Sequence, residues 1–231
     1  MNFPVRPNGL LLLDKPEGWT SHDVVAYMRG VTRVRQIGHT GTLDPFATGL
    51  LILLIGDATK KAVEFHKFSK MYEATIKLGV TTNTYDRTGM VTNEITDLQI
   101  IHRPTVEEKL MDFVGEIKQL PPAFSAKKIQ GRKAYDLARA GQIVNLEPVI
   151  VTVEEIAIHN YEFPLLHAGI TCSTGTYIRS LAHDLGQALG CGATLQELRR
   201  TAIGSYRVQD AIEPKQLRRN TWHERLLPVN L

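Results

Sequence analysis

A loop rich in glycine and hydroxyl side chains, followed at once by a strongly apolar run, places the tightest constraint on how this chain folds. Residues 38–49 read GHTGTLDPFATG, and residues 50–55 read LLILLI. Three glycines, a proline and short polar side chains suit neither a regular helix nor an alternating strand, so the first segment is predicted to be an ordered loop. The six apolar residues behind it predict a buried strand.

Asp44 is the only carboxylate in this loop. Gly41 allows the backbone to approach a ligand closely, and Pro45 fixes φ directly after the acid. A single acid on a rigid loop against a core strand is a candidate nucleophile or general base. The alternative is that Asp44 begins a turn, as Asp before Pro commonly does, and spacing alone favours this alternative.

Composition limits the class of protein. The 231 residues are 43% hydrophobic and 22% charged, enough to bury a core without disulfides or metals. The net charge of +3 permits a polyanionic partner without requiring one. Two cysteines suggest no disulfide framework and the histidines lack metal-ligand spacing, so we expect a cytoplasmic protein without a metal. No apolar run reaches the roughly 20 residues of a membrane-spanning helix, so no membrane is expected either.

Hydrophobic periodicity predicts a mixture of strands and helices. Strands are expected at residues 9–13, 50–55, 72–79, 150–158 and 168–174, the last two paired. Helices are expected at 22–33 with a cap at Thr20 or Ser21, from 105 to 115, from about 134 to 141, and after Gly175. Capping-box patterns at Thr105 and at Thr194 predict helix starts.

Several basic residues have two possible explanations. Arg29, Arg33 and Arg35 lie on or beyond the polar face of the first helix, where simple solvation is favoured. Arg179 lies in the first turn of a later helix, where a cation is disfavoured, so a nearby carboxylate or phosphate is predicted.

Residues 119–147 are predicted to form a projecting flap. Five basic residues lie between positions 127 and 139 against one acid: Lys127, Lys128, Arg132, Lys133 and Arg139. Together with two prolines and an aromatic residue they could grip a phosphate backbone. A solvated basic surface is an equally good explanation.

Five segments, in this order, resemble the tRNA pseudouridine synthase B (TruB) family. They are KPEGWTS at 15–21, GHTGTLDPFATG at 38–49, Tyr72 in its strand, PPAFSAK at 121–127 and GTYIRS at 175–180. The resemblance implies an α+β pseudouridine synthase fold, with a central mixed, largely antiparallel sheet flanked by helices and loops. It also implies an isomerase that converts uridine 55 in the tRNA T loop to pseudouridine by base flipping, without metal or organic cofactor.

The resemblance assigns roles to individual residues. Asp44 matches the catalytic aspartate, which attacks either the uracil ring or C1′ of the ribose. Arg179 matches the arginine that pairs with this aspartate, and Tyr72 the tyrosine that packs on the flipped base. His39 matches the histidine that enters the T loop and fills the space left by the flipped nucleotide. Lys15, at the head of the first segment, is placed with the substrate-binding residues.

Residues 1–231 are therefore expected to form one catalytic domain with a flap insertion, without the family's C-terminal RNA-binding domain, and to act as a monomer on the tRNA T stem-loop. A hypothesis of a different class is a non-catalytic RNA-binding module that helps tRNA to fold. The joint presence of Asp44, Tyr72 and Arg179 favours the enzyme, because binding alone needs no such combination.

Overall fold

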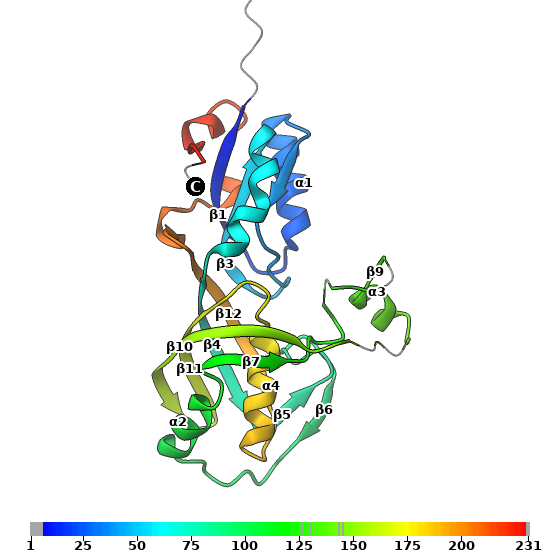
Figure 1. Ribbon diagram of the computed structural model, residues 1–231, viewed down its shortest axis with the longest axis vertical. Helices are drawn as coiled ribbons and strands as arrows, with labels where there is room; N and C mark the ends of the chain where they lie inside the picture. The colour runs from blue at the N-terminus through cyan, green and yellow to red at the C-terminus, as the bar shows by residue number, and fades with distance from the viewer. Residues whose placement is uncertain (1–6, 126, 130, 143, 145, 230–231) are drawn as a thin grey trace, which may run out of the picture. The chain divides into compact units, whose positions relative to one another are not determined.

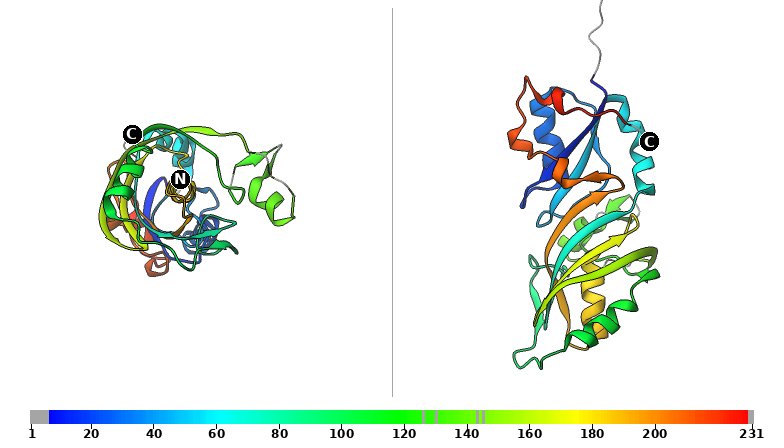
Figure 2. Two further views of the ribbon diagram at one scale, coloured as in Figure 1. Left: turned by 90° about the horizontal axis from the view of Figure 1, so that it is seen from below. Right: turned by 90° about the vertical axis from the view of Figure 1, so that its left-hand side faces the viewer.

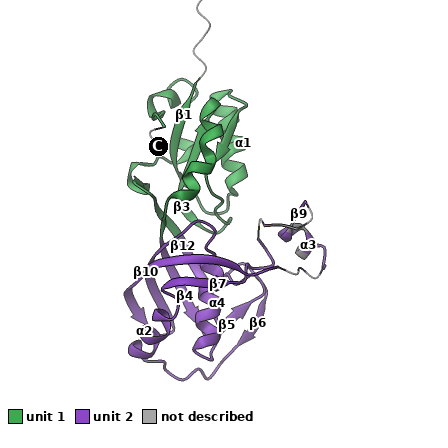
Figure 3. Cartoon of the chain, in the orientation of Figure 1, with its two compact units in different colours: residues 1–71, 199–231 green, residues 72–198 purple. Residues whose placement is uncertain are grey.

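The computed structural model describes residues 7–125, 127–129, 131–142, 144 and 146–229. The chain divides into two compact units (Figure 3). Unit 1 comprises residues 1–71 and 199–231, and unit 2 comprises residues 72–198. Two strands, β4 (Lys70–Leu78) and β12 (Ala193–Ile203), run from one unit into the other.

Strand β3 (Thr48–Ile55) is the centre of unit 1. β1 (Gly9–Lys15) runs antiparallel to it along its whole length, from the pair Gly9 and Ile55 to the pair Lys15 and Gly49. The other edge of β3 is shared by β2 (Ile37–His39), which is antiparallel, and the end of β12, which is parallel. β12 then turns into β13 (Tyr206–Arg207). The apolar run at 50–55 is therefore a buried strand, as predicted.

Alternating side chains of β1 and β3 supply two separate hydrophobic clusters. Leu11, Leu13 and Leu51 pack with α1 (Ser21–Thr32), whereas Leu10, Leu12 and Leu50 pack with the 3-10 helix η1 (Gly56–Lys67). α1 and η1 consequently cover opposite faces of the sheet (Figure 2). Each fully buried aliphatic side chain contributes roughly 1.5–3 kcal/mol, so this double-sided core makes β3 a rigid base for the loop that precedes it.

Unit 2 is built on the strand order β12–β4–β11–β10–β7. β10 (Val149–Glu162) runs antiparallel to both β11 (Leu165–Cys172) and β7 (Gly115–Gln119). Helix α4 (Ile178–Ala188) lies along this sheet and buries Ile178, Leu181 and Leu185 (Figure 1). The mixed, largely antiparallel sheet of the predicted α+β fold is confirmed.

Shorter elements complete the described chain. In unit 2 they are the hairpin β5 (Val80–Thr82) and β6 (Val91–Glu94), helix α2 (Arg103–Met111), and β8 (Lys128–Ile129), β9 (Arg132–Lys133) and α3 (Ala134–Arg139) in the predicted flap. In unit 1 they are the 3-10 helices Val208–Asp210, Pro214–Gln216 and Trp222–Arg225. None of the helices described combines the length and apolar character needed to cross a membrane.

Local signals at helix ends were partly right. Thr20 caps α1, accepting a hydrogen bond from Asp23 N while the Asp23 carboxylate accepts one from Thr20 N. The predicted box at Thr105 is wrong, because α2 begins earlier, at Arg103, and a proline without an N–H is tolerated in that first turn. The predicted box at Thr194 is also wrong. That segment is strand β12, where pairing with neighbouring strands overrides local helix propensity.

Gly49 offers a test of how closely β3 and β12 approach. Its φ is +102°, and an added Cβ would lie 2.3 Å from the carbonyl oxygen of Arg200. Gly18 has φ of +81° with nothing within 4 Å of an added Cβ, so it carries the backbone strain alone. We expect Gly18→Ala to cost about 1–2 kcal/mol and Gly49→Ala clearly more. Urea unfolding followed by the fluorescence of Trp19 and Trp222, both in unit 1, measures the difference, and equal losses would contradict the close approach.

Candidate active site

The Asp44 loop, residues 40–47, connects β2 to β3 in unit 1. Asp44 begins a tight turn, in which the N–H of Ala47 donates to the Asp44 carbonyl oxygen over 3.1 Å. The side chain of Asp44 is half-buried, and Pro45 at the tip of the turn is exposed. The turn expected of an Asp-Pro pair is thus present, and it presents the carboxylate at the edge of a core strand.

Lys15, at the end of β1, holds this turn from below. Its side chain is fully buried, and the ammonium donates to the carbonyl oxygens of Trp19 (2.6 Å), Pro16 (2.9 Å) and Pro45 (3.2 Å). Burial lowers the pKa of Lys15 from 10.5 to about 8, while the nearby Asp44 carboxylate acts in the opposite direction. The structure therefore places Lys15 under the loop, and its predicted role in substrate binding stays a prediction.

Arg200 and Ser21 hold the other half of the loop, and the sequence analysis overlooked both. The buried Arg200 guanidinium donates to the carbonyl oxygens of Leu50 (2.8 Å), Gly41 (3.1 Å) and Thr42 (3.4 Å). The Ser21 hydroxyl accepts from Leu43 N and donates to Leu43 O. The period-two burial of the strand around Arg200 was the available signal, and the capping pattern at Thr194 concealed it.

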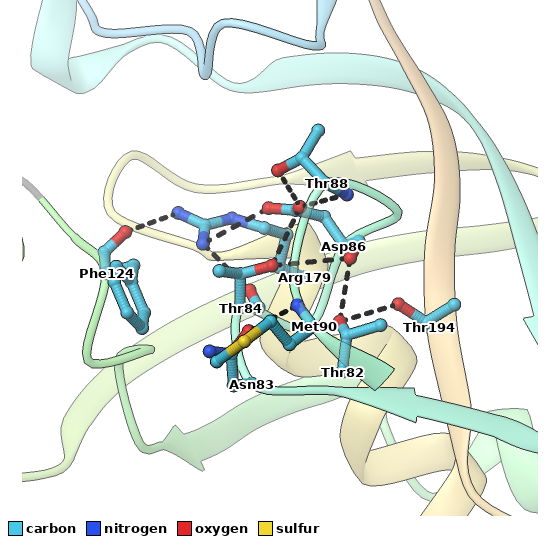
Figure 4. Close-up of polar contacts among 9 residues, drawn as sticks. All are labelled: Thr82, Asn83, Thr84, Asp86, Thr88, Met90, Phe124, Arg179 and Thr194. Carbon is cyan, nitrogen blue, oxygen red and sulfur yellow. Dashed lines mark hydrogen bonds and ion pairs between the residues drawn. The ribbon is translucent and has the colours of Figure 1, made fainter. Parts of the chain in front are cut away.

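In unit 2, Arg179 is buried at the start of α4 and surrounded by acceptors (Figure 4). Its Nη1 lies 3.5 Å from Asp86 Oδ2 and donates to Thr84 O over 3.0 Å, and its Nη2 donates to Phe124 O over 3.0 Å. The anion predicted from a cation at a helix start is therefore present as the Asp86 carboxylate. The predicted pairing of Arg179 with Asp44 is untested, because the two residues belong to different units.

Asp86 is itself held in place, although its sequence context marked only a loop. Its Oδ1 accepts hydrogen bonds from Thr84 Oγ1, Thr88 N and Thr88 Oγ1 at 2.6–2.9 Å, and its carbonyl oxygen accepts one from Thr82 Oγ1 (Figure 4). Thr82 in turn contacts Thr194 of β12. This network fixes the carboxylate and, through it, the guanidinium of Arg179.

The remaining predicted residues lie on regular elements. His39 is the last residue of β2, opposite Leu53 of β3, and is half-buried. Tyr72 is half-buried on β4, and the alternation of the strand puts it on the face that carries the buried Ala74 and Ile76. The roles predicted for His39 and Tyr72 stay predictions.

The flap contributes one described basic contact. Lys127 Nζ donates to Glu147 O over 3.0 Å, and β8 pairs with β9 through Lys128 opposite Lys133. The side chains of Lys128 and Arg132 lie outside the described part of the structure. Among the described residues, no group of three or more histidine, cysteine, aspartate or glutamate side chains could hold a metal ion.

Comparison with known proteins gives the same family along nearly the whole chain. Residues 29–178 match the sequence profile described as "TruB family pseudouridylate synthase (N terminal domain)", and residues 179–229 match "tRNA pseudouridylate synthase B C-terminal domain". A relative from Solibacter usitatus, named tRNA pseudouridine synthase B, is 47% identical over 95% of this chain and 74% of its own. A relative of the same name from Bacteroides fragilis is 43% identical over 93% of each chain.

Two solved structures have a similar backbone. A crystal structure of a Cbf5-Nop10-Gar1 complex matches 95% of this chain and 60% of the compared chain, with a TM-score of 0.72 and 26% identity. An H/ACA RNP bound to a substrate RNA containing 2'-deoxyuridine matches 93% of this chain and 53% of the compared chain, with a TM-score of 0.69 and 26% identity.

The Asp86 network predicts a large loss of stability when its carboxylate is removed. Asp86→Ala leaves the Arg179 guanidinium buried without its counter-charge, which typically costs about 3–5 kcal/mol. Glu107→Ala is the control, because it breaks an exposed ion pair with Arg103 and should cost less than about 1 kcal/mol. Unfolding by urea, followed by circular dichroism, tests both. Similar losses for the two variants would show that Asp86 contributes no more than a surface pair.

Lys15 predicts a pH dependence of stability. Between pH 8 and 10.5 the folded protein binds fewer protons at this residue than the unfolded chain, so its contribution makes stability rise with pH across that window. The rise is at most about 3 kcal/mol. Lys15→Met should remove it, whereas Lys61→Met, at an exposed site, should keep it. Urea unfolding at several pH values measures the slopes, and an unchanged slope in Lys15→Met would contradict the lowered pKa.

Proposed function

Because the chain belongs to the TruB family of pseudouridylate synthases, we propose that it isomerises uridine 55 in the T loop of tRNA, with Asp44 as the catalytic carboxylate. The observation that carries this proposal is the Asp44 loop. It combines the family's sequence segment with a turn whose backbone is fixed from two sides by buried cations. The enzyme is an isomerase, because the product has the same atoms as the substrate.

The reaction exchanges one bond to the ribose for another. The bond between N1 of uracil and C1′ breaks, the base rotates, C5 bonds to C1′, and the hydrogen on C5 leaves as a proton. Asp44 attacks either the uracil ring or C1′ while the base is detached. A carboxylate that reacts at a fixed atom gains most when the fold holds it in place before the substrate binds. The contacts of Lys15, Arg200 and Ser21 with residues on both sides of Asp44 supply this positioning.

The other predicted residues act on the flipped nucleotide and its surroundings. Flipping costs roughly a few kcal/mol of stacking, which Tyr72 offsets by packing on the base, while His39 fills the vacated space in the loop. Arg179 presents a guanidinium fixed by Asp86 and two carbonyl oxygens, suited to orienting the Asp44 carboxylate. We propose that Lys127, Lys128 and Arg132 of the flap contact RNA phosphates.

The substrate is recognised by shape as well as by charge. RNA loops present unstacked bases that a pocket can hold, and the modest net charge of +3 fits recognition of a folded loop rather than of any polyanion. We propose the T stem-loop as the part of tRNA that is bound, one catalytic domain with its flap as the binding body, and a monomer as the active form.

Asp44→Asn tests the catalytic assignment directly. Isomerisation leaves the mass of RNA unchanged but must expel the hydrogen on C5, so tritium release from tRNA labelled at uridine C5 is the measurement. We expect about one equivalent from the wild type and none from Asp44→Asn, because an amide lacks the nucleophilic oxygen charge. Asp14→Asn is a matched control, since Asp14 pairs with Arg199 away from the loop.

Two results would contradict the proposal. Tritium release by Asp44→Asn at the wild-type rate would exclude Asp44 as the catalytic group. No release by the wild type, with tRNA still bound, would favour the alternative of a non-catalytic tRNA-folding module.

A further inference from the structure

The segment that joins α1 to β2, residues 29–36, is here called the arginine turn. Its sequence is RGVTRVRQ, and no acidic residue occurs between Asp23 and Asp44. Arg29, Arg33 and Arg35 are all exposed. The turn thus gathers three positive charges at one end of α1, immediately before the strand that leads to His39.

The backbone of this turn is unusual at Arg33. The residue has φ of 60° and ψ of 14°, the left-handed conformation, and its N–H donates to Arg29 O as the cap of α1. Glycine or asparagine normally occupies this position, because other side chains are strained there. A strained residue retained in a tight turn is a reason to look for a function of its side chain.

Arg29 holds the turn without losing its charge. Its Nε donates to Arg35 O over 3.1 Å, and its Nη2 donates to Ile37 O over 3.2 Å. Both acceptors are neutral carbonyl oxygens, so the guanidinium is positioned but not neutralised. Within the described part of the chain, none of the ion pairs found involves Arg29, Arg33 or Arg35.

We propose that the arginine turn is a phosphate-binding surface for the RNA substrate, with Arg33 and Arg35 as the contacting side chains. The inference rests on the proposed function. Guanidinium groups bind phosphate oxygens through paired N–H donors, and fixed positive charges without counter-charges favour a polyanion. Arg35 is four residues from His39, and four extended residues span at most about 14 Å. Backbone phosphates beside the nucleotide that His39 contacts are therefore within its range.

Stabilisation of α1 is the competing explanation. Positive charge near a helix C-terminus interacts favourably with the helix dipole, and Arg29 lies in the last turn. The two explanations predict different effects of removing Arg33 and Arg35. A dipole role affects thermal stability and leaves RNA affinity unchanged, whereas a phosphate-binding role affects RNA affinity and its dependence on salt.

The test compares the double variant Arg33→Gln/Arg35→Gln with Arg218→Gln/Arg219→Gln. The control removes two exposed arginines from the same unit and changes the net charge equally. The affinity for unmodified tRNA is measured by filter binding between 50 and 300 mM salt. Each lost phosphate contact reduces the slope of log K against log salt by about 0.7–0.9. At 0.1 M salt the arginine-turn variant should bind roughly tenfold to 40-fold more weakly, and the control should bind like the wild type.

Arg33→Gly separates strain from charge. It relieves the left-handed strain and removes one charge, so we expect a higher melting temperature together with weaker tRNA binding. Equal salt slopes for the double variant and its control would overturn the proposal. Loss of thermal stability with unchanged affinity would also overturn it, in favour of the dipole. Tritium release at saturating tRNA, expected from both double variants at the wild-type rate, reports separately on the proposed function.

Discussion

The Asp44 loop depends on two buried cations that bind backbone carbonyl oxygens. Lys15 and Arg200 direct six hydrogen bonds into unit 1, at least one of them to each half of the loop. Burying a charge is costly unless it is fully hydrogen-bonded, so each cation requires the loop carbonyls as much as the loop requires the cations. This mutual dependence gives a segment without regular structure one stable conformation. It also surrounds the half-buried Asp44 with positive charge.

The two cations are not interchangeable. An arginine remains charged at any pH at which the protein folds, whereas burial brings the pKa of Lys15 to about 8. The guanidinium reaches three carbonyl oxygens in a planar fork, at Leu50 in the strand and at Gly41 and Thr42 in the loop. It therefore ties the loop to β3, while the compact ammonium of Lys15 ties the Asp-Pro turn to the end of β1.

The sequence was informative where structure is set locally. The apolar run at 50–55, the cap at Thr20 and the Asp-Pro turn depend on neighbouring residues, and all were predicted. Arg200 and Asp86 escaped prediction because their partners are far away in the chain: Arg200 binds carbonyls about 150 residues earlier, and Asp86 meets an arginine 93 residues later. Backbone carbonyls have no identity in a sequence, so no motif could mark them as partners. The same reason explains the error at Thr194, where a helix-like pattern lies within a sheet.

Arginines in this protein can be sorted by what satisfies their N–H groups. Arg200 donates to carbonyl oxygens inside unit 1, and Arg179 to a carboxylate and carbonyls inside unit 2. Both are buried, so their charge acts on the fold around them. Arg33 and Arg35 are exposed, and Arg29, which holds their turn, keeps its own charge. An exposed guanidinium on a backbone that is both fixed and strained gains little for folding, since solvent screens it. What such a group gains from an arriving phosphate is correspondingly larger, because the turn is already ordered before binding.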